Sequence, residues 1–197
     1  MKRSDQKKQS RELLLQQGLT LIRSQGYHGT GIQEIVNAVG LPKGSFYNYF
    51  ESKESFVTEV VGYFAQRSHE SYAKIRQETP DPRECIKIFF VEKAEKIIES
   101  DFQGGCILGN LSNELSNQQP EVQQAIAKEL NKVAALIAES VKEGQQAGLI
   151  NQKMSPSSLA DLILNAWEGA LIRVNSSRSK APFDQFFGEF LEFCLGP

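Results

Sequence analysis

Residues 43–49 bring an unusual set of polar side chains together in one short stretch. Within it lie a cation, a hydroxyl, an amide and two phenols. Pro42 before it suits the first turn of a helix, and Ser52 behind it suits the cap of the next one. Because so short a helix is not stable alone, neighbouring elements must hold it in place. Side chains of these types contact phosphates and base edges, so the stretch predicts a surface that enters a DNA groove.

The residues upstream fit a helix-turn-helix module. A first helix is expected over about 4–25, ended by Gly26, and a second from its N-cap Thr30 to Gly40. In such a module the last helix lies in the major groove and the helix before it crosses the backbone. The predicted DNA-contacting residues are Lys7, Lys8, Thr30, Gln33, Lys43, Gly44, Ser45, Tyr47, Asn48, Tyr49 and Lys53.

Tyr47 and Tyr49 separate this interpretation from a plain hydrophobic core. Phe46 and Phe50 are typical core residues of a small bundle. In a core, however, both phenols would need buried hydrogen-bond partners. The pair of tyrosines therefore favours a surface that contacts DNA.

The charge of the chain is unevenly divided. Residues 1–50 hold seven basic and three acidic residues, a net charge of +4, while the remainder holds 15 basic and 21 acidic residues, a net charge of −6. A basic head on an acidic body fits a head that meets a polyanion. Charge alone does not distinguish this arrangement from a basic tail that is only solvated.

Several classes of protein are disfavoured by the composition. No apolar run approaches the roughly 20 residues that span a bilayer, and the N-terminus lacks a secretory pattern. The three cysteines Cys85, Cys106 and Cys194 are widely spaced, which argues against a disulfide framework and for a reducing cytoplasm. The sequence contains no phosphate loop, catalytic triad order or metal-ligand spacing, so we expect no enzyme activity, no cofactor and no metal.

Almost the whole chain is predicted to be helical. The apolar spacing and the Gly and Pro breaks indicate an all-α fold of about nine helices. We expect a helix-turn-helix DNA-binding domain over residues 1–51 and a helical effector-binding and dimerisation domain over residues 52–197.

A series of residues between positions 8 and 60 follows a family pattern. It comprises Arg11, Leu14, Leu15, Leu21, Ile22, Gly26, Tyr27, Thr30, Ile35, Gly40, Leu41, the run 43–47, Tyr49, Phe50 and the run 52–54. In spacing and residue type it resembles the TetR family of bacterial transcriptional repressors. The resemblance implies a homodimer that binds a palindromic operator and is released by a small-molecule effector. Gly31, usually Ser or Thr, and Gly18, usually Ala, depart from the family pattern.

Two sets of residues in the body are candidates for the other functions. The candidate effector-contacting residues are Tyr63, Phe64, Phe89, Phe90, Cys106, Asn110, Asn113, Trp167 and Glu168. The candidate dimer interface is the apolar face of the last two helices, where the family also dimerises: Leu159, Ile163, Phe183, Phe186, Phe187 and Phe190. The alternative for the first set is ordinary core or surface, and some residues of the second set must belong to the core.

Cys106 offers a second interpretation of regulation. It follows two glycines at a predicted helix N-terminus, where the backbone N–H groups favour a reactive thiolate. The stretch 104–111 resembles a TetR subgroup with a Gly-Cys at this place, some of whose members are similar to sensors of electrophiles or oxidants. The alternatives are a buried apolar thiol and, for the whole chain, a helical adaptor that does not bind DNA.

Overall fold

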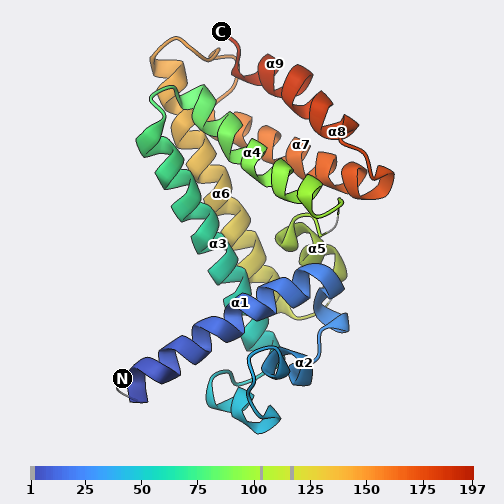
Figure 1. Cartoon of the computed structure of the whole chain (residues 1–197). Coiled ribbons are helices and arrows are strands. Elements are labelled where there is room, and N and C mark those ends of the chain that lie inside the picture. The colour runs from blue at the N-terminus through green and yellow to red at the C-terminus, as the bar shows by residue number, and fades with distance from the viewer. Residues whose placement is uncertain (1–2, 103, 116–117) are drawn as a thin grey trace. The chain divides into compact units, whose positions relative to one another are not determined.

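The regular structure of this chain, seen here in a computed structural model, is helical throughout the described residues 3–102, 104–115 and 118–197 (Figure 1). The helices are α1 (Arg3–Gly29), α2 (Ile32–Asn37), the 3₁₀ helix η1 (Lys43–Asn48), α3 (Lys53–Glu78), α4 (Pro82–Glu99), α5 (Ile107–Glu114), α6 (Pro120–Gln146), α7 (Pro156–Ser177), α8 (Ala181–Gln185), the π-helical η2 (Phe186–Leu191) and α9 (Glu192–Leu195). The prediction of an all-α fold is confirmed.

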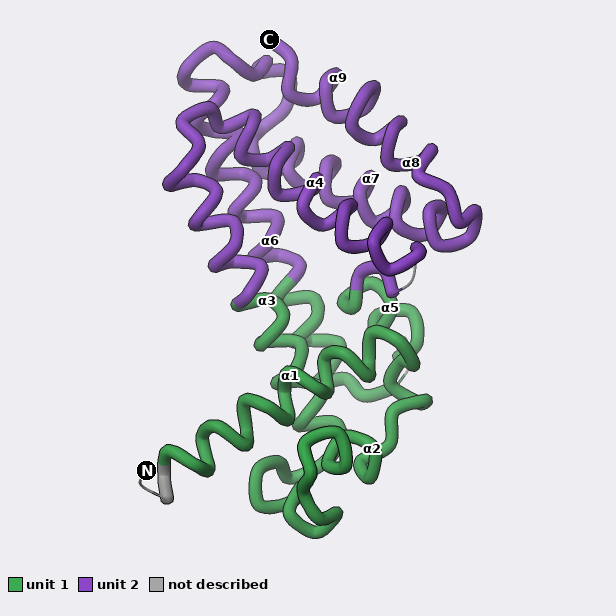
Figure 2. Tube along the Cα trace, in the orientation of Figure 1, with its two compact units in different colours: residues 1–66, 107–129 green, residues 67–106, 130–197 purple. Residues whose placement is uncertain are grey.

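The chain forms two compact units (Figure 2). Unit 1 comprises residues 1–66 and 107–129, and unit 2 comprises residues 67–106 and 130–197. The packing therefore groups α5 and the start of α6 with the helix-turn-helix. The division into functional domains at residue 51 stays a prediction.

Predicted breaks in the body coincide with capped helix starts. The carboxylate of Asp81 accepts a hydrogen bond from the backbone N–H of Arg83 at 2.8 Å, at the start of α4. The hydroxyl of Ser155 accepts one from the N–H of Ser158 at 3.2 Å, at the start of α7. A proline follows each cap, where its missing N–H costs nothing.

Three phenylalanine rings pack together in the core of unit 1. The centroid of Phe46 lies 5.4 Å from those of Phe50 and Phe56, and all three side chains are buried. Gly18 of α1 faces the Phe56 ring, and a Cβ added there would lie 2.2 Å from Phe56 Cζ. The close approach of this ring explains why glycine stands where the resembling family usually has alanine.

Helix α1 is bent at Gly26, whose φ of 75° and ψ of −176° are not helical. The prediction that Thr30 caps the second helix is wrong, because the N-cap of α2 is Gly31. Thr30 is fully buried, and its hydroxyl donates to the carbonyl oxygen of Gly26 at 2.7 Å. This buried bond ties the end of the connection between α1 and α2 to its beginning.

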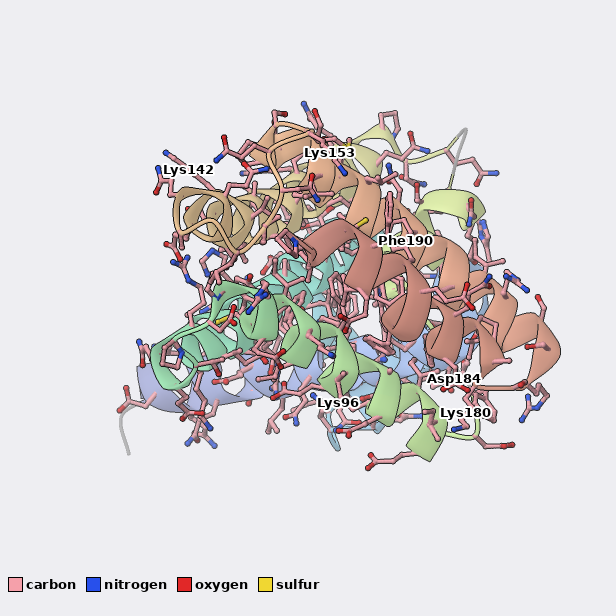
Figure 3. The ribbon with its side chains drawn as sticks, turned by 90° about the horizontal axis from the view of Figure 1, so that it is seen from above. Lys96, Lys142, Lys153, Lys180, Asp184 and Phe190 are labelled. Carbon is pink, nitrogen blue, oxygen red and sulfur yellow. The ribbon has the colours of Figure 1, made fainter. Side chains whose placement is uncertain are left out.

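Aromatic rings also fill the core of unit 2. Trp167 of α7 stacks on Phe183 with ring centroids 5.2 Å apart, and Phe90 of α4 lies 5.0 Å from Trp167. Phe190 of η2 packs on Phe186 at 5.8 Å and stays half-buried. Charged side chains such as those of Lys96 and Lys142 lie on the outside (Figure 3).

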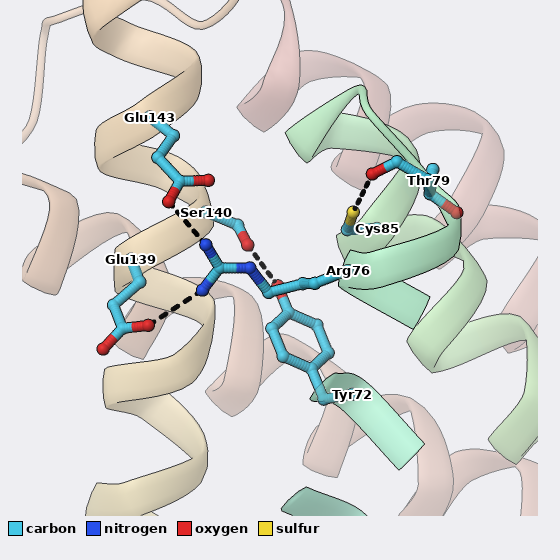
Figure 4. Close-up of polar contacts among 7 residues, drawn as sticks. All are labelled: Tyr72, Arg76, Thr79, Cys85, Glu139, Ser140 and Glu143. Atoms are coloured by element: carbon cyan, nitrogen blue, oxygen red, sulfur yellow. Dashed lines mark hydrogen bonds and ion pairs between the residues drawn. The ribbon is translucent and has the colours of Figure 1, made fainter. Parts of the chain in front are cut away.

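Polar contacts join α3 to α6 within unit 2 (Figure 4). The hydroxyl of Tyr72, a fully buried residue, donates to the Ser140 hydroxyl at 2.7 Å. Burial raises the pKa of Tyr72 to about 12. One helical turn further on, the guanidinium of Arg76 donates to Glu139 at 2.8 Å and to Glu143 at 2.5 Å.

Replacing Tyr72 by phenylalanine should lower the free energy of unfolding by about 1–3 kcal/mol, because the fully buried Ser140 loses its partner. Urea unfolding measures the change. The matched control is Tyr47→Phe, which removes a phenol hydroxyl from a side chain that is 58% exposed, and should shift the free energy by no more than about 0.5 kcal/mol. Equal unfolding curves for the two variants would show that the buried bond contributes nothing.

Candidate nucleic-acid interface and regulatory residues

The 3₁₀ helix η1 presents the predicted recognition residues. It spans Lys43–Asn48, and the N–H and hydroxyl of Ser45 both donate to the Pro42 carbonyl oxygen, at 2.9 and 2.6 Å. Lys43, Gly44, Tyr47 and Asn48 are exposed, whereas the Phe46 ring between them is buried. The short helix is thus anchored through one apolar ring and leaves its polar side chains outside.

The N-terminal part of α1 contributes cations beside this helix. The ammonium of Lys7 lies 5.9 Å from the ring centroid of Tyr49, which is half-buried, and Lys8 is exposed. The Arg11 guanidinium lies 5.2 Å from the Phe50 centroid and forms an ion pair with Glu59. Exposed lysines and phenols on one surface suit phosphate contact.

Gln33 is the exposed predicted contact on α2. Its side-chain amide donates to the Asn37 side-chain oxygen at 2.6 Å, one turn along the helix. Gly31, the N-cap of α2, is exposed, and a Cβ added there would meet no atom within 4 Å. The start of α2 therefore offers the Gln33 amide and open backbone to an approaching phosphate.

Two residues predicted to contact phosphates, Thr30 and Lys53, make hydrogen bonds within unit 1 instead. Thr30 is fully buried, so the prediction that it contacts DNA is wrong. The ammonium of Lys53 donates to the Tyr27 carbonyl oxygen at 2.5 Å and lies 4.3 Å above the Tyr27 ring. Burial lowers the pKa of Lys53, which is half-buried. We therefore omit both residues from the proposed DNA-contacting set.

Tyr27 and Glu54 form a hydrogen-bonded pair that the sequence pattern did not reveal. The Tyr27 hydroxyl donates to Glu54 Oε1 at 2.7 Å. Burial first, and then the bond to Glu54, raises the pKa of Tyr27 well above its usual value, while the same bond lowers the pKa of the Glu54 carboxyl. In the sequence, Tyr27 and His28 lie between two glycines, a pattern that predicts a linker and not a hydrogen-bonded pair.

The candidate effector-contacting residues divide between the two units. Phe89, Phe90 and Trp167 belong to the buried core of unit 2. Of the residues in unit 1, Tyr63 and Phe64 of α3 are half-buried. Asn110 and Asn113 of α5 are exposed and so lie outside the buried core.

Glu168 of unit 2 interacts with Cys106 and with Lys93. Burial raises the pKa of Glu168, whereas a hydrogen bond with Cys106 and the charge of Lys93 act in the opposite direction. The ammonium of Lys93 lies 4.3 Å from the Phe89 centroid and donates to the Ser68 hydroxyl at 3.3 Å. The sequence suggested both Cys106 and Glu168, but nothing in it paired them.

The other two thiols are less accessible, and that of Cys85 donates to the Thr79 carbonyl oxygen at 3.2 Å. Cys85 and Cys194 are buried, and burial raises the pKa of both. Cys106 is half-buried and directly precedes the first residue of α5. Among the three thiols, Cys106 is therefore the one that a small reagent can reach.

The predicted dimer residues lie mostly inside one protomer. Leu159, Ile163, Phe183 and Phe186 are buried in the core of unit 2, whereas Phe187 and Phe190 are half-buried. The four buried side chains therefore fill the core of the protomer. This corrects the expectation that they form an apolar surface for a second protomer. The exposed apolar residues of the last helices are Leu162, Ile172 and Phe193, which the sequence analysis missed.

Two further observations concern the described residues alone. No cluster of three or more His, Cys, Asp or Glu residues there is able to hold a metal ion. None of the helices there is long and apolar enough to span a membrane.

A basic helix-turn-helix followed by a helical body defines a DNA-binding regulator. Two family models match the chain: "Bacterial regulatory proteins, tetR family" over residues 14–60 and "Tetracyclin repressor-like, C-terminal domain" over residues 89–190. The chain belongs to the TetR family of bacterial transcriptional regulators and is a DNA-binding transcriptional repressor. The further resemblance to a subgroup with a Gly-Cys stays a prediction.

Relatives and solved structures agree with this assignment. The HTH-type transcriptional repressor DhaR of Mycobacterium sp. (strain GP1) is 31% identical over 186 residues, which cover 94% of this chain and 92% of DhaR. The repressor NemR of Escherichia coli K12 is 26% identical over 176 residues, 89% of this chain and 88% of NemR. The crystal structure of E. coli NemR in its reduced form superposes with a TM-score of 0.87 at 25% identity, over 96% of this chain and 100% of that one.

Replacing Lys43 by alanine should weaken binding to all DNA sequences and lower the slope of log affinity against log salt by about one per protomer, because one phosphate contact is lost. Fluorescence anisotropy at several salt concentrations measures this slope. The matched control is Lys142→Ala, which removes an exposed lysine from α6 in unit 2 and should leave the slope unchanged. An unchanged slope for Lys43→Ala would contradict the phosphate contact.

Proposed function

We propose that this repressor binds a palindromic operator as a homodimer and leaves it when a small molecule binds to the body. The observation that carries the proposal is the anchored helix η1, with Lys43, Tyr47 and Asn48 outside and Phe46 inside. One such helix reads only a few base pairs. Two copies related by a two-fold axis read two half-sites one helical turn apart and supply the remaining specificity.

The proposed DNA contacts are residues of unit 1 that are exposed or half-buried. Lys43 and Ser45 stand at the start of η1 and suit phosphate. Tyr47 and Asn48 suit base edges and the thymine methyl group. The set comprises Lys7, Lys8, Gln33, Lys43, Gly44, Ser45, Tyr47, Asn48 and Tyr49.

A row of exposed positions on α7 supports a dimer interface. Leu162, Asn165, Gly169 and Ile172 are spaced by three or four residues, so they share one face of the helix. A Cβ added to Gly169 would meet no atom within 4 Å, so the face is open within the protomer. On α9 the Phe193 side chain is 77% exposed. We propose that these five residues, the α7–α9 face, pack against the same face of a second copy.

Replacing Ile172, which is 61% exposed, by aspartate should convert the dimer into monomers, because the two-fold axis brings two carboxylates into an apolar interface. Sedimentation velocity measures the oligomeric state. Binding of the variant to a duplex with two half-sites should then fall to its affinity for one half-site. The matched control is Ile98→Asp on α4, which replaces another exposed isoleucine. A dimer that survives Ile172→Asp but not Ile98→Asp would overturn the proposed face.

Release by an effector is proposed as a population shift. Helices α3 and α6 each start in unit 1 and end in unit 2. A ligand that binds one arrangement of the body better than the other changes the fraction of dimers whose recognition helices match the operator. Phe89, Phe90, Trp167 and Glu168 are the proposed ligand contacts, supported by their aromatic and ionisable chemistry.

A second candidate mechanism is covalent sensing through Cys106. It is supported by the half-buried thiol and by its hydrogen bond with Glu168. When the sulfur of Cys106 attacks an electrophilic carbon, a sulfur–carbon bond forms, the leaving group departs, and the Glu168 carboxylate takes the thiol proton. Modification would then release the operator without a reversible ligand.

Under this second mechanism, iodoacetamide at neutral pH should alkylate Cys106 faster than it alkylates a free model thiol and should release the operator. Mass spectrometry locates the modified residue. Cys106→Ser should keep its operator through the same treatment, and Glu168→Gln should slow the alkylation by roughly tenfold or more, because the proton acceptor is lost. A rate no faster than that of the model thiol would exclude this mechanism.

A further inference from the structure

The bend in α1 leaves two backbone donors without a partner in their own helix. Gly26 breaks the helical ladder with its φ of 75°, and the chain turns again through Tyr27 and His28. The first N–H groups of any helical turn lack an acceptor within that turn. Here both are satisfied by one side chain from α5, since Glu114 Oε2 accepts from Tyr27 N–H and Glu114 Oε1 from His28 N–H, each at 2.7 Å.

Gly26 makes this approach possible. A Cβ added at Gly26 would lie 2.6 Å from Glu114 Oε2 and 3.0 Å from Oε1. A side chain at this position would therefore push the carboxylate away from the two N–H groups. Gly26 therefore bends α1 and also leaves room for the Glu114 carboxylate that accepts from the two N–H groups.

Other contacts hold the same segment from α3. The carbonyl oxygen of Tyr27 accepts from Lys53, and its hydroxyl donates to Glu54, which also accepts from the Gln119 side-chain amide at 3.4 Å. Among the described contacts of residues 26–30, Glu114 is the α5 side chain that bonds their backbone. All of these residues belong to unit 1.

The charge of Glu114 argues against a direct role in binding DNA. A carboxylate in the unit that binds DNA repels phosphates, so by electrostatics alone its removal should tighten binding. As a cap it acts in the opposite direction, because a charge-assisted bond to two N–H groups fixes the connection that leads into α2. The two roles therefore predict opposite signs for the same variant.

We infer that Glu114 is a positioning residue for operator binding, which fixes the start of the helix-turn-helix to α5 through the backbone of Tyr27 and His28. The inference rests on the proposed function because it assumes that the helix-turn-helix binds an operator. It connects α5, the helix that begins directly after Cys106, to the elements that contact DNA. A displacement of α5 changes the connection at residues 26–28 before it reaches α2 and η1.

The test is Glu114→Gln in the full chain. Glutamine keeps the size but replaces one acceptor oxygen by an N–H donor that faces a backbone donor. Hydrogen exchange should become roughly tenfold faster in the peptide that contains residues 26–30 and stay unchanged in peptides from the core of unit 2. Operator affinity should fall by roughly tenfold with an unchanged salt slope, since no phosphate contact is removed.

The matched control is Glu121→Gln, which removes an exposed carboxylate from the first turn of α6 in the same unit. It should leave exchange unchanged and operator affinity equal or higher. If Glu114→Gln behaves like this control in both measurements, the inference is overturned. The exchange readout needs no DNA, so a wild-type chain that binds no palindromic duplex would refute the proposed function and still leave the cap tested.

A second variant guards against a Glu114→Gln chain that does not fold. Gly26→Ala keeps the carboxylate but crowds it, and it also strains the backbone at a φ of 75°, so it should produce at least the same local rise in exchange at residues 26–30. Unchanged exchange in Gly26→Ala would show that the cap does not hold this connection and would overturn the inference.

Discussion

The burial of Phe46 is the contact on which the DNA-reading surface depends. A helix of six residues has too few internal hydrogen bonds to persist in water. Phe46 fixes η1 by packing against Phe50 and Phe56, and Phe56 in turn fits against α1 only because Gly18 has no side chain. Since the anchor uses one side of η1, the other side is left for polar groups such as Tyr47. Packing thus decides which residues are able to meet DNA.

The connection around Tyr27 shows a different kind of constraint, in which polar groups are held by elements distant in sequence. The backbone N–H of Tyr27 reaches Glu114, 87 residues away, and its hydroxyl reaches Glu54, 27 residues away. Each bond satisfies a group that would otherwise be buried without a partner, at a cost of about 1–3 kcal/mol. The bend at Gly26 therefore depends on contacts with both α3 and α5. A movement of either helix should change the connection that leads into the helix-turn-helix.

The features that the sequence predicted are those set by a few neighbouring residues, such as helix ends. The caps at Asp81 and Ser155 and the positive φ of Gly26 and Gly148 are properties of a few neighbouring residues, so helix boundaries of this kind follow from local sequence. The role of Lys53 and the partner of Cys106 depend on residues far along the chain, and no spacing encodes them. For the last helices the pattern was apolar on more than one face, so it did not separate a buried residue such as Ile163 from an exposed neighbour such as Leu162.

The net charge of residues 1–50 has to be interpreted by which of its basic residues are paired and which are exposed. The net charge of +4 over residues 1–50 counts Arg11, yet Arg11 is paired with Glu59 and lies over Phe50. The exposed cations Lys7, Lys8 and Lys43 lie on α1 and at the start of η1. Charge alone did not distinguish a DNA-binding head from a solvated tail, because the total ignores such pairing. Lys43 lies in the same short helix as Tyr47, and Lys7 lies beside Tyr49. These positions favour a DNA-binding head, since DNA affinity depends on where the cations lie and not on their number alone.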